Sequence, residues 1–254
     1  MIDFTNSKYE ELCRTIADMD WNVITVQKYL QKNLETPCLI LRHDVDRFPR
    51  SALRLAKIEN RYGLQSTYYF RYTRHVFKKE IINEIYDLGH EIGYHYEVLS
   101  KARGDIELAA KLFRDELVEF RKLVPVQTAS MHGRPLSKYH NLKLWEHYTP
   151  EQFGLIGEAY KNIDFSILHY YSDTGRTWHS TKYNLRDKVN HPKNQKEVET
   201  TEDLINILKS GAQNSYCLLT HPNRWSSGDF EWGISLLFDL MANLAKIALN
   251  LIRK

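Results

Sequence analysis

Two aspartates at the end of an apolar run are the first residues that could carry out chemistry. The run Leu39-Ile-Leu-Arg-His-Asp-Val-Asp46 predicts a buried strand, and Asp44 and Asp46 stand two residues apart, so their side chains share one face of an extended chain. Two carboxylates this close are costly to ionise together in a dry pocket unless a cation lies beside them. The pattern predicts one metal ligand and one base. The structural alternative is an N-cap for the helix that begins near Pro49, but a cap needs only one aspartate.

A histidine occurs near the end of a second such run, Gly89-His-Glu-Ile-Gly-Tyr-His-Tyr-Glu97. Alternation along a strand places His95 on the same face as Glu91 and Glu97, and nearer than the other histidine of this run to its carboxyl end. A lone histidine on a strand is more often a core residue, with its hydrogen bonds made inside the protein, than a metal ligand. His95 is therefore a candidate ligand only in combination with other residues.

Two further apolar runs also end in ionisable residues. His132 and Arg134 follow the first, in Ser130-Met-His-Gly-Arg-Pro135, and His221 follows the second, in Ser215-Tyr-Cys-Leu-Leu-Thr-His. An arginine at such a position could hold a carboxylate with two hydrogen bonds. Each motif alone is ambiguous, but parallel strands carry functional residues at their carboxyl ends, and all four motifs meet that condition.

Strand-like runs alternate with helical segments along the chain. One helical segment begins at Pro49 and ends at Gly63, and a second runs from Lys78 to Leu88. We therefore predict an α/β fold, a distorted (β/α) barrel of about seven parallel strands, with an open doubly wound sheet as the alternative. The predicted strands are Cys38 to Leu41, Leu64 to Phe70, Glu91 to Tyr96, Thr128 to Met131, Ile163 to His169 and Tyr216 to Thr220, and a polar surface segment is predicted from Asn184 to Thr201.

The length of 254 residues favours a single domain, with 1–36 as an N-terminal helical extension, 37–226 as the motif-bearing barrel and 227–254 as a C-terminal helix. The net charge of +3 is small and its lysines and arginines are scattered, so no nucleic-acid partner is expected. Three cysteines without a short spacing indicate neither a disulfide framework nor a zinc knuckle, and they favour a reducing compartment.

Neither end of the chain predicts stable membrane insertion. The first residues show no basic segment followed by an apolar run, so we expect no signal peptide and a cytoplasmic protein. The apolar stretch from Ile234 to Ile252 contains Asp239, Asn243, Lys246 and Asn250, which are unfavourable at a bilayer centre. A docked terminal helix is favoured over membrane contact. The oligomeric state stays open.

In this order, over Leu39 to Trp225, the motifs resemble those of the polysaccharide deacetylase family, carbohydrate esterase family 4. The chain looks especially like the WbmS-type branch found with O-antigen and surface-polysaccharide biosynthesis. The resemblance implies a hydrolase with a divalent metal, often zinc, that removes the acetyl group from an N-acetylated sugar. It also implies that Asp44 is the catalytic base, that Asp46 and His95 bind the metal, that His221 protonates the leaving amine and that Arg134 positions the base.

The chain departs from the family pattern at the second metal histidine, because the position four residues after His95 is Leu99. His132 could replace it from the next strand, or Glu97 from the same face as His95, and we favour His132. The motif Asp173-Thr-Gly-Arg-Thr-Trp178 has altered spacing, so Asp173 could orient a catalytic group and Trp178 could line the pocket, or both could belong to an ordinary loop. An allantoinase-like amidohydrolase and a non-catalytic sugar-binding relative are the rival interpretations.

Overall fold

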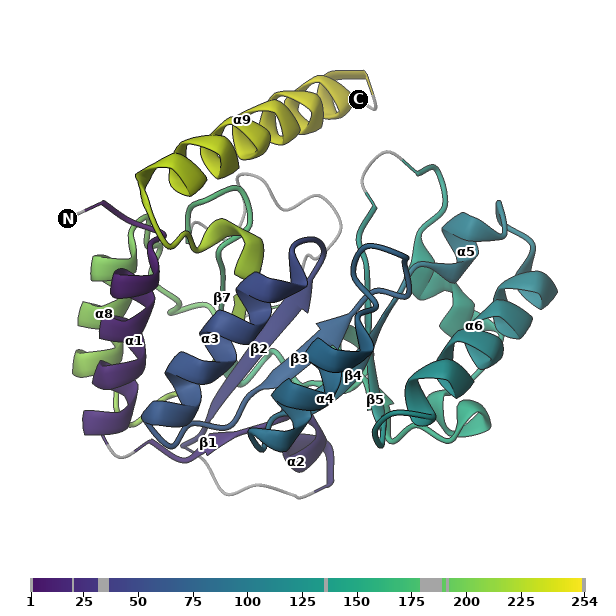
Figure 1. Ribbon diagram of the computed structural model, residues 1–254, viewed down its shortest axis with the longest axis horizontal. Coiled ribbons are helices and arrows are strands. Elements are labelled where there is room, and N and C mark those ends of the chain that lie inside the picture. The colour runs from purple at the N-terminus through teal and green to yellow at the C-terminus, as the bar shows by residue number, and fades with distance from the viewer. Residues whose placement is uncertain are drawn as a thin grey trace.

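A parallel sheet forms the centre of the computed structural model, which describes residues 2–19, 21–31, 37–134, 137–178, 189–190 and 192–252, without the side chains of 242 and 244–252 (Figure 1). Its eight strands within these ranges are ordered β6-β5-β4-β3-β2-β8-β7, with β1 paired to β2. The sheet curls into a half-barrel, which confirms the predicted distorted barrel. The strands are β1 (Val23–Ile24), β2 (Leu39–Val45), β3 (Thr67–Phe70), β4 (Glu91–Tyr96), β5 (Thr128–Met131), β6 (Gly157–Glu158), β7 (Leu168–Ser172) and β8 (Ser215–Thr220).

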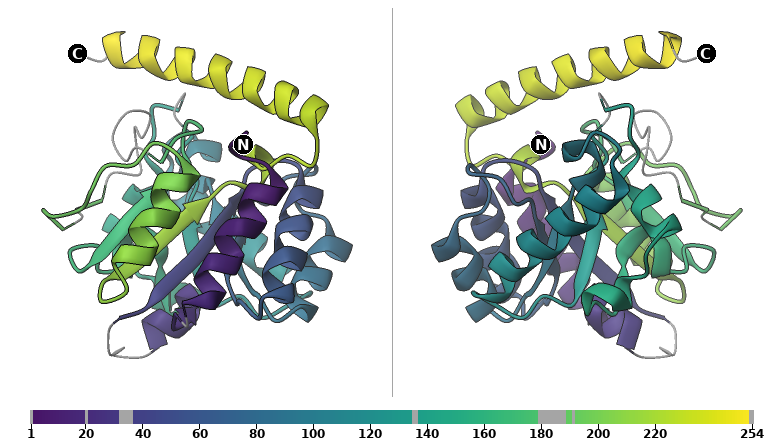
Figure 2. Two further views of the ribbon diagram at one scale, coloured as in Figure 1. Left: turned by 90° about the vertical axis from the view of Figure 1, so that its left-hand side faces the viewer. Right: turned by 90° about the vertical axis from the view of Figure 1, so that its right-hand side faces the viewer.

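Helices cover the outer face of the sheet, and the last one crosses above its carboxyl edge (Figures 1 and 2). Several start at caps that satisfy free backbone N–H groups; for example, Thr5 accepts from Lys8 N at 3.2 Å, and Asp105 accepts from Leu108 N at 2.9 Å. The α-helices are α1 (Asn6–Asp18), α2 (Val26–Gln31), α3 (Pro49–Arg61), α4 (Lys79–Asp87), α5 (Val98–Lys101), α6 (Ile106–Arg121), α7 (Ala159–Asn162), α8 (Thr201–Ser210) and α9 (Asp229–Ile252). The short 3₁₀ helices are η1 (Asn141–Glu146), η2 (Pro150–Phe153) and η3 (Pro222–Arg224).

The period of two along β2 separates the outer core from the barrel interior. Leu39 and Leu41 pack outward in a cluster with α1, α3 and α8, whereas Ile40 packs inward in a separate cluster. Arg42 and Asp44 continue the inward line and are buried. Because every strand pairing is parallel, all strands end at the same edge, and the inward line of β2 leads to that edge.

Strand positions agree closely with the sequence except near β7. Strands β4 and β5 have the predicted bounds, but the run predicted from Ile163 to His169 is extended only from Leu168. The start of the run is a turn, because Asp164 Oδ1 accepts hydrogen bonds from Ser166 N at 3.0 Å and from its hydroxyl at 2.5 Å. Strands β1 and β6 were missed, since two residues give no periodic signal.

Two other expectations concern the polar segment and the membrane. Much of the predicted segment from Asn184 to Thr201 lies outside the described residues, and the part at 192–200 is irregular up to the start of α8. Among the helices in the described part of the chain, none combines the length and the apolar character needed to span a bilayer.

Candidate metal centre

Three strand ends bring Asp46, His95 and His132 together at the carboxyl edge of the half-barrel. Asp46 follows β2 directly, His95 lies on β4, and His132 follows β5. The register of β4 with β5 aligns His95 with Ser130, and His132 N donates to Tyr96 O at 2.8 Å, which holds the two imidazoles side by side. Each residue offers a ligand atom, and these atoms all lie within 4.8 Å of one another.

The donor set fits a metal ion. Asp46 Oδ1 lies 3.3 Å from His95 Nε2 and 3.1 Å from His132 Nδ1, and the two nitrogens are 3.3 Å apart. Two ligands at zinc distances on a tetrahedral ion would be separated by about 3.3 Å. Asp46 Oδ1 is buried and has no hydrogen-bond partner of good geometry among the described residues, which is costly unless a cation lies there. The three residues could therefore hold one metal ion.

The surroundings prepare these side chains as ligands. His95 Nδ1 lies 3.0 Å from the Ser130 carbonyl oxygen, so it carries the proton and leaves the Nε2 lone pair free toward Asp46. Burial raises the pKa of Asp46, but the positive charge of His132, followed by the close contacts of His132 and His95 with the carboxylate, outweighs burial and holds the pKa well below its ordinary value. Asp46 is thus an ionised carboxylate, the form that binds metals.

Asp44 lies beside the three ligands and is held by an arginine from its own strand. Its Oδ2 is 3.7 Å from His95 Nε2, and Arg42 Nη2 donates to Asp44 Oδ1 at 3.0 Å and to Ser130 Oγ at 2.7 Å. Burial raises the pKa of Asp44, but the Arg42 guanidinium, followed by His95, lowers it below the ordinary range. Asp44 is therefore a buried carboxylate that can accept a proton.

Arg134, expected to position Asp44, lies at a different place. Its side chain is 46% exposed, and its Nη1 is 3.4 Å from Glu97 Oε2. Arg71 Nη2 donates to the other Glu97 oxygen at 2.8 Å, so the Glu97 carboxylate is engaged by guanidinium groups and not by the candidate metal ligands. The guanidinium that contacts Asp44 belongs to Arg42. The sequence carried a signal for it, because Arg42 and Asp44 share one strand face.

His221 is held in one orientation by Asp173. The Nδ1 atom of His221 lies 2.6 Å from Asp173 Oδ1, and its backbone N–H donates to Oδ2 at 2.9 Å. Arg224 Nη1 and Trp225 Nε1 donate to the same carboxylate at 2.8 and 3.0 Å. Burial raises the pKa of Asp173, but Arg224 and His221 lower it below the ordinary value, so the carboxylate stays ionised. The contributions of Arg224 and Trp225 were not predicted.

His221 lies close enough to the two aspartates of the first motif for its charge to lower the pKa of both Asp44 and Asp46. Trp178, which could have lined the pocket, is instead fully buried, stacks with Phe4 and donates to Thr201 Oγ1 at 3.0 Å. It belongs to the core.

A possible metal site, a buried carboxylate beside it and a histidine held by an aspartate thus meet at one edge of the half-barrel. Such a set can bind an ion, accept a proton from water and donate a proton to a substrate. The fold agrees with the deacetylase resemblance, and the family assignment stays a prediction. No family model matches the chain, and neither a curated protein nor a solved structure matches it.

Proposed function

We propose that the chain is a metal-dependent N-deacetylase that acts on an N-acetylated sugar in surface-polysaccharide or O-antigen biosynthesis. The observation that carries the proposal is the cluster of Asp46, His95 and His132, with ligand atoms within 4.8 Å of one another. Of the two residues that the resemblance assigns to proton transfer, Asp44 lies 3.7 Å from His95 Nε2, and His221 is close enough for its charge to lower the pKa of Asp46.

Zinc is the metal that we propose for the cluster. One carboxylate oxygen and two imidazole nitrogens are ligands that zinc accepts, and catalytic zinc sites pair three protein ligands with an open position. When bound, the metal would lower the pKa of a water molecule and polarise the amide carbonyl. Asp46, His95 and His132 would hold it, and Glu97 would not, because Arg71 and Arg134 occupy its oxygens.

The other residues of the site have separate tasks. Asp44, kept ionised by Arg42, accepts the proton of the attacking water at a carboxylate oxygen. Protonated His221 donates from Nε2 to the departing nitrogen, because Asp173 accepts a hydrogen bond from Nδ1 and holds the ring in one orientation. An amide nitrogen leaves readily only when it is protonated, so an oriented histidine favours amide over ester substrates. The products are acetate and a free amine.

Metal analysis of matched variants tests the proposal. Purified wild-type protein should carry about one equivalent of zinc, as expected for a single three-ligand site. Asp46→Ala, His95→Ala and His132→Ala should lose it, whereas Glu97→Ala, the matched control at the same edge, should retain it. Retention of zinc by His132→Ala together with its loss from Glu97→Ala would contradict the assigned ligand set.

Acetate release tests the reaction class. The zinc-loaded wild type should release acetate from one of three N-acetylated sugars, presented as a nucleotide sugar, a lipid-linked saccharide and a polymer. Asp46→Ala should release none. A zinc-loaded enzyme that leaves all three intact and hydrolyses allantoin would refute the sugar deacetylase and support the small-amide alternative.

A further inference from the structure

Helix α9 docks on the protein through a polar line and leaves an apolar face exposed. Ser235, Asp239 and Asn243 are spaced four residues apart, share one side of the helix and are at most 8% exposed. The opposite side carries large apolar side chains, with Phe230 83% and Met241 61% exposed. This is the reverse of a surface helix in a globular domain, whose apolar stripe faces the core.

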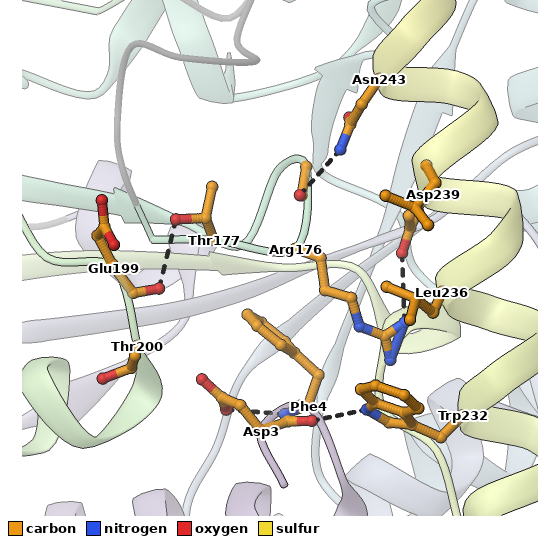
Figure 3. Close-up of a pocket in the computed structure, with 12 residues that line it drawn as sticks. Asp3, Phe4, Arg176, Thr177, Glu199, Thr200, Trp232, Leu236, Asp239 and Asn243 are labelled. Atoms are coloured by element: carbon orange, nitrogen blue, oxygen red, sulfur yellow. Dashed lines mark hydrogen bonds and ion pairs between the residues drawn. The ribbon is translucent and has the colours of Figure 1, made fainter.

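Specific contacts fix this orientation. Figure 3 shows Asp239 and Asn243 pointing from α9 toward the body, where Asn243 Nδ2 donates to Gly175 O at 3.1 Å. Asp239 lies 3.7 Å from Arg176 and 3.6 Å from Arg224. Ser235 Oγ completes the line by donating to Asn223 O at 3.0 Å. A helix rotated to bury its apolar side would lose all of these contacts, so the exposed face belongs to the folded state.

The exposed apolar face is broad. At about 100° per residue, its members span about 160° of the helix circumference, opposite Asp239. A coiled-coil seam for a single partner helix is narrower. The residues of this face, called here the α9 apolar face, are Phe230, Ile234, Leu237, Phe238, Leu240 and Met241, each at least 42% exposed.

A basic groove lies beside the first turn of α9. It has a volume of about 850 Å³, and Arg50, His75 and Lys78 line it together with Phe48, whose side chain is exposed. Arg54, also in its wall, pairs with Glu231 of α9 at 2.6 Å, so the groove adjoins the helix. A broad apolar face next to exposed cationic side chains is complementary to a bilayer with anionic headgroups.

We propose that α9 binds the surface of an anionic membrane, with its apolar face in the interface plane and the basic groove on the headgroups. A second copy of the chain is a poorer occupant, because a chain of net charge +3 offers the basic groove no excess of acidic groups. The helix crosses the edge that carries the candidate metal centre, and Asp239 lies 3.9 Å from Arg47, the residue after Asp46 (Figures 1 and 2). Binding would therefore hold that edge at the bilayer, whatever reaction it performs.

Vesicle co-sedimentation tests the proposal independently of activity. Full-length protein is mixed with vesicles of phosphatidylcholine alone or of phosphatidylcholine with phosphatidylglycerol. Wild type should sediment with the anionic vesicles. The variant Phe230→Ser/Leu237→Ser/Met241→Ser should bind at least about tenfold more weakly, since it removes three apolar side chains that would be buried in the bilayer. The matched control, Leu108→Ser/Val118→Ser/Ile167→Ser, alters three apolar side chains that are 44 to 52% exposed on other surfaces and should bind like wild type.

Charge reversal in the basic groove is the second test of the membrane proposal. Arg50→Glu/Lys78→Glu should weaken binding to anionic vesicles, and added salt should do the same to wild type. Failure of wild type to bind anionic vesicles would overturn the proposal. So would equal binding by the α9 triple variant, or a wild-type dimer in sedimentation analysis that this variant converts to monomer.

Discussion

Acid should destabilise the protein through Glu59, a fully buried glutamate of α3 beneath the outer face of the sheet. Its carboxylate accepts hydrogen bonds from Ser66 Oγ at 2.7 Å and from Tyr68 OH at 2.8 Å, and His43 Nε2 of β2 lies 2.7 Å from it. Tyr9 OH also donates to it. Burial raises the pKa of Glu59, but His43 and these donors outweigh it and lower the pKa from 4.5 to about 2.

This shift fixes both the sign and the size of the effect. Because the pKa is depressed in the folded state, Glu59 stabilises the protein fully above pH 4.5, and the contribution is lost as the pH falls toward 2. Ionisation at about 2 instead of 4.5 corresponds to about 3 kcal/mol at neutral pH. About 2 kcal/mol of this should be gone by about pH 3.

Urea denaturation of wild type and Glu59→Gln, at several values between about pH 7 and pH 3, measures the effect as a difference in the free energy of unfolding. The advantage of wild type should shrink by about 2 kcal/mol over that range. Glu116→Gln is a matched control of opposite sign, because burial raises the pKa of Glu116, so glutamate there should lose its advantage as the pH rises. A Glu59→Gln difference that stays constant with pH would refute the reasoning.

Three further outcomes are expected. Asp44→Asn should retain zinc but lower acetate release by at least about 100-fold, as measured by metal analysis and steady-state turnover, because it removes the proton acceptor. Asp173→Asn should lower turnover by about 100-fold or more with little change in KM, because the 2.6 Å contact that orients His221 loses its charge. Gly93→Ala should cost about 1–3 kcal/mol in urea denaturation, since its Cβ would lie 2.2 Å from the Tyr69 ring; wild-type stability would contradict that packing argument.

The sequence predicted the clustering at the edge of the sheet, because it depends on a simple rule. Parallel strands end on one side of a sheet, so ionisable residues that follow buried runs must approach one another. Asp46, His95 and His132 come from strands far apart in sequence, and the structure brings their ligand atoms together.

Arginine positions were harder to predict, because they depend on loop paths and partners. Arg134 was expected at Asp44 because the family resemblance implied it, but its backbone φ of +36° turns the chain, and its guanidinium lies by Glu97. Arg42 lies within a buried strand. From the sequence alone, a charged residue there indicates only an unfavourable free energy of burial, because its partner is not known. This unfavourable burial energy indicates that Arg42 is there to pair with Asp44. A fully buried guanidinium is tolerated only where a carboxylate such as Asp44 is paired with it.

The proposed use of His132 as the third metal ligand follows from the strand geometry. The family pattern places its second histidine one helical turn after the first, and in this chain that residue, Leu99 of α5, is 3% exposed and packs in the core. The imidazole of His132, from the end of β5, lies beside His95, because the pairing of β4 with β5 sets His95 opposite Ser130, two residues before His132. Strand pairing is at least as rigid a support as a helical turn, so under the proposed function His132 would supply the third ligand while position 99 serves packing.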